Sequence, residues 1–339
     1  MNKQLNVLVI FDTAGSPPAD QNFEAELKTE AWKTESHIIE TIKELGHHVF
    51  TVGIFDKLSP LFEAVSKQKP DIIFNLVEWF DGKTWYDRNI VGLYELLKIR
   101  YTGASPPSLM LCKNKALAKQ ILSYHRIKTP AFKVIPKASR ISLPKKLKYP
   151  ILIKPLKEEA SYGISQKSLV TDHTAYKERV GFIHQSLNQD ALAEEYVEGR
   201  EIYVSVLGNQ RLQVFPYREM IFGEVPSEEP KFATFKAKWD ENYRKRWGIK
   251  NYFVKSLASG VAEKIETVCK NAYRHLSMCG YGRLDLRLTP QNEVVIIEAN
   301  PNPFIAKDED FALSAQKAGL SYPELVQKIL NLGLGLLPE

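Results

Sequence analysis

The 339-residue sequence is poor in cysteine and histidine, and neither residue forms a pattern typical of a metal site. The three cysteines, Cys112, Cys269 and Cys279, lack CxxC spacing. An odd number of thiols without a disulfide framework is typical of a reducing compartment, so we expect a cytoplasmic location. The histidines contain no HExxH and no pair with zinc-ligand spacing. A zinc protein and a disulfide-stapled secreted protein are therefore excluded.

Long apolar runs, low-complexity tracts and internal repeats are also absent. The most hydrophobic segments are far shorter than the roughly 20 residues that span a membrane. No basic leader or cleavage site accompanies the first apolar run, Leu5–Phe11, which we expect to be a buried strand. No GxGxxG follows this run, so the dinucleotide-binding fingerprint is missing. We expect neither a membrane partner nor a dinucleotide cofactor.

Composition favours a globular protein with a cleft. With 44% hydrophobic and 25% charged residues the chain is not disordered, and its length is suited to two or three lobes. The net charge of +6 comes partly from Lys133–Lys157 and Arg244–Arg246, but no helix-turn-helix or zinc-finger pattern accompanies these clusters. We therefore expect no nucleic-acid partner. A small anionic substrate would also favour a positive cleft.

Strands and helices alternate over the first hundred residues. This rhythm predicts a parallel sheet with helical crossovers. The predicted strands are Val7–Phe11, His48–Ile54 and Asp71–Leu76, and the predicted helices are Glu24–Leu45, Leu58–Lys67 and Asn89–Leu97.

A more β-rich part follows a predicted helix at about Cys112–His125. The segment Ile221–Tyr252, rich in charge, proline and aromatics, is predicted to be a long functional loop. Further strands are predicted at 151–154, 192–197, 201–207, 210–216, 283–288 and 294–298, and further helices at 174–185, 259–276 and 322–330.

Two strands near the C-terminus direct polar groups to one side. Strict alternation in Arg283–Leu288 places Arg283 and Asp285 on one face, and Glu298 and Asn300 share a face of the next strand. Pairing as a hairpin brings these four residues together. Carboxylate and amide oxygens are suited to Mg²⁺, and an arginine beside them can stabilise a transferring phosphoryl group. An amphipathic hairpin facing water is the alternative, but Glu298 follows four apolar residues and needs a partner.

Three other segments are suited to binding a nucleotide such as ATP. Lys154 ends an apolar strand, where a buried lysine needs an anion. Small residues around Ser161 and Gly163 allow backbone amides to cover phosphates, although an ordinary turn has the same composition. The stretch Ala193–Glu201 can offer its backbone to a base and a carboxylate to a ribose, or it can be a charged hairpin. Lys113, at the start of a helix, can be a surface lysine.

Together these segments resemble the D-alanine–D-alanine ligase branch of the ATP-grasp superfamily. The resemblance covers most of the chain in collinear order: Tyr101-Thr102-Gly103, Lys113–Lys119, Lys154-Pro155, Ser161-Tyr162-Gly163, Glu194–Glu201, Ala237-Lys238-Trp239, Gly282–Asp285 and Glu298–Pro301. It implies an α/β and α+β chain with the ATP-grasp fold. An N-terminal Rossmann-like pre-ATP-grasp domain (1–108) would precede a central subdomain (109–197) and a C-terminal catalytic subdomain (198–339).

The resemblance also implies roles for single residues toward ATP. Lys113 and Lys154 would contact phosphates, and Ser161 would cover them. The backbone of Glu195 and Val197 would receive adenine. The side chain of Glu194 would also bind the adenine, and the side chain of Glu201 would bind the ribose.

The implied catalytic groups lie in the last third of the chain. Asp285, Glu298 and Asn300 would hold two Mg²⁺ ions, with Mn²⁺ as a substitute. Lys238 would reach the γ-phosphate from a closing loop. Arg283 would stabilise an acyl phosphate and the tetrahedral intermediate.

The groups expected around the first substrate differ from the family pattern. Asp12–Pro18 stands where the family has Gly-Gly-x-Ser-x-Glu, Glu78 where it has a histidine, and Ala160 where it has a serine. Asn302–Ala306 replaces the closing Pro-Gly-Met-Thr. We therefore expect Glu78 and Asn302 to belong to a different substrate pocket. Glu78 should meet a cation, either a substrate ammonium or a nearby side chain such as Lys83 or Arg88.

These observations predict an ATP- and Mg²⁺-dependent ligase that joins small amino-acid-like substrates through an acyl phosphate. One alternative is a true D-alanine–D-alanine ligase with drifted motifs. Another is a catalytically silent nucleotide-binding protein, although the complete set of Arg283, Asp285, Glu298 and Asn300 argues against it. The sequence leaves the oligomeric state open, with a homodimer as one option.

Overall fold

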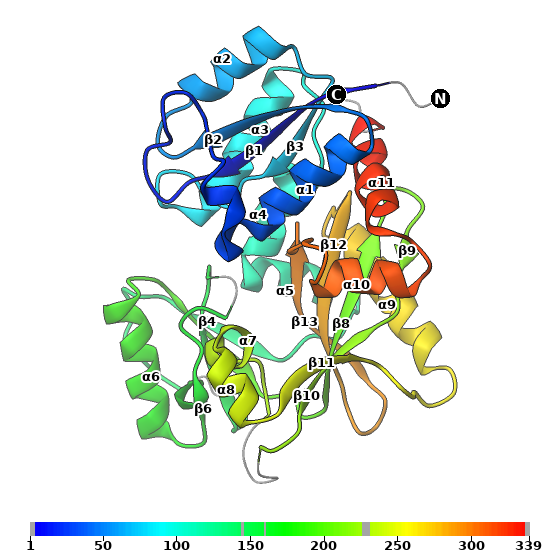
Figure 1. The fold of residues 1–339 in the computed structure, drawn as a ribbon. Coiled ribbons are helices and arrows are strands. Elements are labelled where there is room, and N and C mark those ends of the chain that lie inside the picture. The colour runs from blue at the N-terminus through cyan, green and yellow to red at the C-terminus, as the bar shows by residue number, and fades with distance from the viewer. Residues whose placement is uncertain (1–3, 144–145, 159–160, 226–230, 336–339) are drawn as a thin grey trace.

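The first part of the chain folds around a parallel three-stranded sheet in a computed structural model that describes residues 4–143, 146–158, 161–225 and 231–335 (Figure 1). The strand order is β2-β1-β3, and both neighbours of the central strand run parallel to it. The predicted alternation of strands and helices is therefore confirmed. The strands are β1 (Asn6–Asp12), β2 (His48–Ile54) and β3 (Ile72–Leu76).

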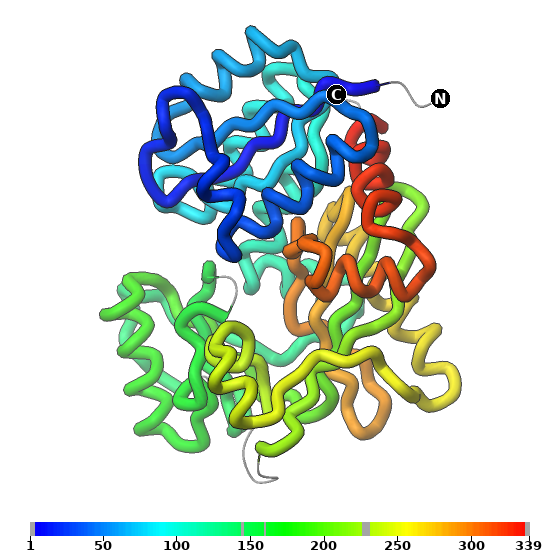
Figure 2. Tube along the Cα trace, in the orientation of Figure 1, coloured from blue at the N-terminus to red at the C-terminus, as the bar shows by residue number. Residues whose placement is uncertain are grey.

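Helices cover both faces of this sheet because β1 is apolar on both sides. Val7, Val9 and Phe11 face one core, whereas Leu8 and Ile10 face the other. The first core is closed by α1 (Lys33–Glu44) and by α11 (Tyr322–Leu334), which returns from the far end of the chain (Figures 1 and 2). The second core is closed by α2 (Ser59–Gln68), α3 (Asp87–Leu96) and α4 (Pro106–Lys113).

The predicted helix over Glu24–Leu45 was wrong over Glu24–Trp32, because α1 begins only at Lys33. Two 3-10 turns, η1 (Glu26–Lys28) and η2 (Glu30–Trp32), precede α1. The rings of Phe23 and Trp32 both contact Phe11, with centroids 5.0 and 5.2 Å away. A straight α-helix places residues nine apart on opposite faces, so it could not bring both rings to one partner.

The predicted helix over about Cys112–His125 is confirmed from Lys115 to Tyr124, but its first two residues belong to a separate helix. That helix, α4, starts earlier on a proline pair, and α5 (Lys115–Tyr124) follows after a break at Asn114. Asn114 has extended dihedral angles, and its side chain accepts a hydrogen bond from the amide of Leu117, 3.2 Å away. This is an N-cap, which starts a new helix in a new direction.

The central part of the chain forms a four-stranded antiparallel sheet. The strand order is β4-β7-β5-β6, and α6 (His173–Ser186) packs on one face through the core around Tyr176 and Val180. The elements are β4 (Phe132–Ile135), β5 (Ile151–Pro155), η4 (Gln166–Ser168), β6 (Leu169–Val170) and β7 (Ala191–Glu195).

The last part forms an antiparallel sheet in the order β11-β10-β8-β12-β13, with β9 pairing with β8. Two helices, α5 and α9 (Val261–His275), cover one face of this sheet. None of the helices in the described ranges is long and apolar enough to cross a bilayer. The remaining elements are η3 (Thr84–Tyr86), β8 (Arg200–Leu207), β9 (Gln213–Val214), β10 (Arg218–Phe222), β11 (Ile249–Phe253), β12 (Tyr281–Leu288), β13 (Val294–Pro301) and α10 (Asp310–Lys317).

The predicted loop over Ile221–Tyr252 was wrong in its second half, which carries two short helices and a strand. These are α7 (Phe235–Trp239), α8 (Glu241–Arg246) and β11, while residues 226–230 lie outside the described ranges. Thr234 and Asp240 accept hydrogen bonds from the amides of Ala237 and Tyr243, at 3.1 and 2.9 Å. Side-chain caps thus start helices too short for hydrophobic periodicity to reveal.

Candidate active site

Two cavities meet at one lysine. The larger, of about 760 Å³, lies between the N-terminal sheet, the end of β13 and the segment 238–252. The smaller, of about 70 Å³, lies between the central and C-terminal sheets, and we call it the nucleotide cleft. Lys238 lines both. The two cavities therefore share a wall at Lys238.

The predicted hairpin is confirmed, and it brings the four polar residues together. On β12 and β13, Arg283 pairs with Asn300 and Asp285 with Glu298, and the register shifts just after Asp285. Arg283 holds Asp285 through two bonds, Nε to Oδ1 at 2.7 Å and Nη2 to Oδ2 at 3.0 Å. Burial opposes the charge of Arg283, but Asp285 outweighs it and raises the arginine pKa. Asp285 and Glu298 line the nucleotide cleft, whereas Arg283 and Asn300 line the larger cavity.

Glu298 is surrounded by lysines. Lys115 Nζ lies 3.0 Å from its Oε1. Burial would raise the pKa of Glu298, but the charges of Lys115, Lys238 and Lys154 prevail and lower it to about 2. Glu298 is therefore an anion at every pH where a nucleotide would bind. Lys115 was not predicted from the sequence, because its position at the start of α5 depends on the break at Asn114.

A second buried network ties the nucleotide cleft to the strand that carries Glu298. Lys154 Nζ lies 2.5 Å from Glu194 Oε2. Lys119 Nζ lies 3.1 Å from Glu194 Oε1, and this second contact is an ion pair without hydrogen-bond geometry. Lys119 also donates to the carbonyl of Ile297 at 2.7 Å. Burial lowers the pKa of Lys119, whereas Glu194 is held ionised because the two lysines outweigh its own burial and lower its pKa. The predicted adenine ligand Glu194 is thus fully engaged with lysines.

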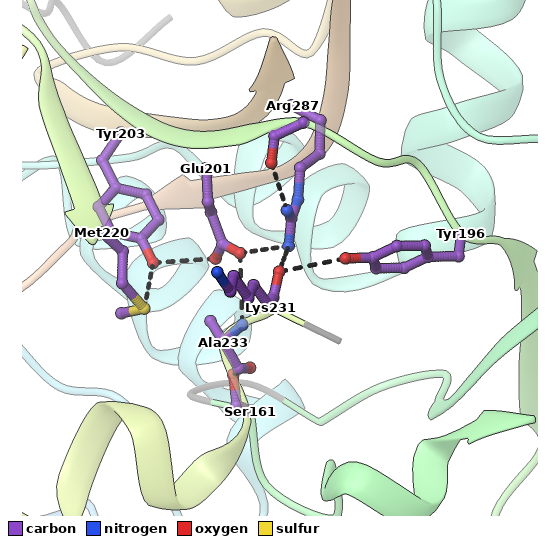
Figure 3. Close-up of polar contacts among 9 residues, drawn as sticks. Ser161, Tyr196, Glu201, Tyr203, Met220, Lys231, Ala233 and Arg287 are labelled. Atoms are coloured by element: carbon purple, nitrogen blue, oxygen red, sulfur yellow. Dashed lines mark hydrogen bonds and ion pairs between the residues drawn. The ribbon is translucent and has the colours of Figure 1, made fainter. Parts of the chain in front are cut away.

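The predicted ribose ligand, Glu201, lies in a hydrogen-bonded cluster (Figure 3). Its Oε2 is 2.6 Å from Nη2 of Arg287, and its Oε1 accepts from the hydroxyl of Tyr203 at 2.9 Å. The amide of Ala233 approaches Oε2 at 3.3 Å. Arg287 shares a strand with Arg283, and alternation already placed both on one face, but no role for Arg287 followed from the sequence.

Three further residues predicted to contact the nucleotide, Glu195, Val197 and Ser161, line the cleft as well. Glu195 and Val197 lie on one wall, although the backbone amide of Glu195 is used by the carbonyl of Ala131 at 2.9 Å. Ser161 adopts a positive φ of 61° and donates from Oγ to the carbonyl of Ala233 at 3.0 Å. Ala160, where the family has a serine, lies outside the described residues.

Short helix α7 presents Lys238 between two aromatic contacts. Phe235 meets Tyr162 of the phosphate loop edge-on, with ring centroids 6.3 Å apart. Trp239 meets Phe304, just past β13, at 5.7 Å. The two ring contacts flank Lys238 and join α7 to the central part of the chain through Tyr162 and to the C-terminal part through Phe304.

Lys113 and Asn302 lie away from the nucleotide cleft. Lys113 forms an ion pair with Asp87 at 2.7 Å and lines the larger cavity. Asn302 Oδ1 accepts from the amide of Ala104 at 2.7 Å, so this side chain links the end of β13 to the N-terminal part. The place of Lys113 differs from the phosphate contact that the resemblance implied. Asn302 lines the larger cavity, where it was expected, and has a structural contact as well.

Glu78 lines the larger cavity, as expected, at the carboxyl end of the parallel sheet. Its amide donates to Asp12 Oδ1 at 2.6 Å. Burial raises the pKa of Asp12 to about 7, although the amides of Glu78 and Trp79 work against this. Lys83, one of the expected partners of Glu78, is paired with Asp81 instead.

The residues present are suited to a magnesium ion that arrives with a nucleotide. Asp285 and Glu298 are paired across the hairpin, and Mg²⁺ commonly takes one or two carboxylates and completes its shell with phosphates and water. Asn300 lies opposite Arg283 in the same hairpin, and its amide oxygen is of the kind that Mg²⁺ accepts as a ligand. Within the described residues, no cluster of three or more His, Cys, Asp or Glu could hold a metal by itself. The donor set is therefore suited to a shared site rather than to a closed protein cage.

Comparison with known proteins gives one concordant picture. A family model described as the D-ala D-ala ligase C-terminus matches residues 114–331. A Sinorhizobium fredii protein, y4sG, is 27% identical over 299 residues, which is 87% of this chain and 85% of that protein. The D-alanine–D-alanine ligase of Bordetella avium is 29% identical over 287 residues, or 84% and 83%. The solved D-alanine–D-alanine ligase from Bacillus anthracis superimposes with a TM-score of 0.77 at 20% identity and 98% coverage of both chains.

Proposed function

The chain belongs to the D-alanine–D-alanine ligase family and has the ATP-grasp fold, and we propose that it uses ATP and Mg²⁺ to join a small amino-acid-like carboxylate to an amine through an acyl phosphate. The resemblance and the fold class expected from the sequence are confirmed. The protein is an ATP-dependent carboxylate–amine ligase. The metal, the acyl phosphate and the roles of single residues make up the proposal.

One observation carries the proposal: Lys238 lines both cavities, with the nucleotide groups on one side and Arg283 on the other. ATP would lie with its base near Glu195–Val197, its ribose at Glu201 and its phosphates near Lys115 and Lys154. The γ-phosphate would then point toward the larger cavity. A volume of about 760 Å³ there is ample for two small substrates.

In the first step, an oxygen of the substrate carboxylate attacks the γ-phosphorus, and the bond to ADP breaks. Lys238 and Lys154 would offset the charge on the transferring group, since a cation fixed in place needs no reorganisation during the reaction. Mg²⁺ held by Asp285, Glu298 and Asn300 would supply the remaining charge neutralisation when bound.

In the second step, the amine nitrogen attacks the acyl carbon, phosphate leaves, and the nitrogen loses a proton. Arg283 would stabilise the negative charge that develops on the acyl oxygen, because Asp285 keeps its guanidinium charged and oriented. Segment 231–253 would shield the acyl phosphate from water. Holding both reactants in one cavity supplies the proximity that the second step requires.

The test is phosphate release from ATP across a panel of D- and L-amino acids and dipeptides, with D-alanine included. We expect Mg²⁺-dependent release with a particular substrate pair, and Glu298→Gln should lower it by about 100-fold, the order typical for losing one charge-stabilising group. Glu293→Gln is the matched control, because Glu293 lies in the same hairpin but pairs with Lys128 at the surface. Mg²⁺-dependent turnover that survives Glu298→Gln would contradict the metal assignment.

A further inference from the structure

Arg287 is a buried cation in the nucleotide cleft that the proposed chemistry leaves without a role. It lies on β12, is 5% exposed and lines the same cleft as Glu201 and Lys154. A guanidinium so deeply buried is costly unless all its donors are used. Its partners therefore show what the residue is for.

The guanidinium of Arg287 contacts two other parts of the chain, the start of β8 and the segment at Lys231 (Figure 3). Its Nη1 donates to the carbonyl of Gly199 at 2.8 Å, in the turn before β8. Its Nη2 donates both to Glu201 Oε2 at 2.6 Å and to the carbonyl of Lys231 at 2.9 Å. One nitrogen atom thus holds the proposed ribose carboxylate and the start of the segment that carries Lys238.

The segment around Lys231 is fixed at the same place by other bonds. The hydroxyl of Tyr196 donates to the Lys231 carbonyl at 3.2 Å, and the amide of Ala233 donates to Glu201. Ser161 Oγ binds the Ala233 carbonyl from the phosphate loop. We call residues 231–234 the lid base, because α7 with Lys238 follows directly.

Glu201 retains capacity for a ligand while it holds these partners. A carboxylate offers about four acceptor positions. Three are filled, by Arg287 and Ala233 at Oε2 and by Tyr203 at Oε1. A ribose hydroxyl can donate to the remaining position on Oε1 without displacing Arg287.

We propose that Arg287 is a positioning residue that couples ribose recognition by Glu201 to the placement of the lid base. This inference rests on the proposed function, in which ATP occupies the nucleotide cleft. A ribose hydroxyl bound to Glu201 fixes that carboxylate, and Arg287 passes the constraint to the Lys231 carbonyl. Lys238 is then brought to the phosphate only when a ribose is present.

The test compares ADP with 2′,3′-dideoxy-ADP, which lacks both ribose hydroxyls, in the presence of Mg²⁺. Affinity is measured by calorimetry, and the state of the lid by the rate of tryptic cleavage within residues 231–246. The wild-type protein should bind ADP about tenfold more tightly or better, since hydrogen bonds to charged groups are among the stronger ones. ADP should also slow cleavage more than the dideoxy nucleotide does.

Arg287→Lys keeps the charge but not the fork geometry, and Arg287→Met removes both. Each variant should lose the tighter binding of ADP over 2′,3′-dideoxy-ADP, and in the methionine variant the two affinities should agree to within about twofold. Each variant should also lose the extra protection from trypsin that ADP gives. Arg200→Lys is the matched control, because Arg200 forms a two-bond pair with Glu219 outside the cleft. Should the methionine variant not fold, the lysine variant decides.

The proposal requires both losses in the same variant. Loss of ribose preference without loss of protection, or the reverse, would overturn it. An equal effect of Arg200→Lys would overturn it too. Wild-type protein that binds no ADP would instead overturn the proposed function, and this inference with it.

Discussion

At the scale of single residues, partners distinguish the roles of similar side chains. Lys113 and Lys115 are two positions apart, yet one pairs with Asp87 at the larger cavity and the other with Glu298 in the nucleotide cleft. The break at Asn114 causes this separation, because α4 ends before it and α5 starts after it. The family resemblance implied Lys113 for the phosphates, whereas Lys115 is the one of the two lysines that lines the nucleotide cleft.

The two lysines should therefore respond differently to removal of their charge. Lys115→Met should raise the KM for ATP about 10- to 100-fold, as expected for a lost charge-assisted contact. Lys113→Met should leave the KM for ATP within about threefold of the wild-type value and should instead raise the KM for the carboxylate or amine substrate. Steady-state kinetics of both variants would check this. A large rise in the KM for ATP in the Lys113 variant alone would restore the original interpretation.

At the scale of elements, periodicity determined what could be predicted. The strands with clear alternation or apolar runs were found, and so was the hairpin that brings Asp285 and Glu298 together, because the two strands are joined by a short connection. The short helices α7 and α8 were missed, since each starts at a side-chain cap and is too short for periodicity to reveal; α7 also has aromatic contacts with distant segments. Lys238 was identified from its match to the family motif, although the helix that carries it was not predicted.

The aromatic contacts beside Lys238 lead to a prediction for α7. Trp239→Ala and Phe304→Ala each remove an edge-to-face pair, of a kind that contributes about 0.5–1.5 kcal/mol. Each should lower kcat about 2- to 10-fold by loosening Lys238, and the double variant should be little worse than either single one. Phe62→Ala, an exposed ring on α2, serves as the control. Additive effects of the two substitutions would show that the rings act separately.

At the scale of the whole molecule, the N-terminal and C-terminal parts meet through backbone as well as side chains. Gly103 has a φ of +92°, and a Cβ there would lie 2.4 Å from Asn302 Oδ1. The same asparagine binds the Ala104 amide. Gly280 also lies close to Gly103: a Cβ on Gly280 would be 3.0 Å from the Cα of Gly103. These small residues allow the two parts to pack closely enough to form the wall of the larger cavity.

Gly103→Ala should therefore lower the free energy of unfolding by more than the strain of a positive φ alone. Gly46→Ala is the control, because Gly46 has a similar φ of +82° but open space around it. Strain from a positive φ should cost both variants about 1–2 kcal/mol, and the displaced Asn302 should add a further 1–3 kcal/mol in the first. Denaturant unfolding of the two variants measures the difference. Equal destabilisation would mean that the contact at Asn302 adapts without cost.

The position of α11 has a consequence for the order in which the molecule can be made. Its residues cover the same face of β1 as α1 does, although more than 300 residues separate it from β1. The central sheet, by contrast, uses only residues between Phe132 and Glu195. On the ribosome, the first sheet emerges before the central one, but part of its apolar face stays uncovered until α11 has been made. The middle of the polypeptide can therefore reach its final form before its beginning does.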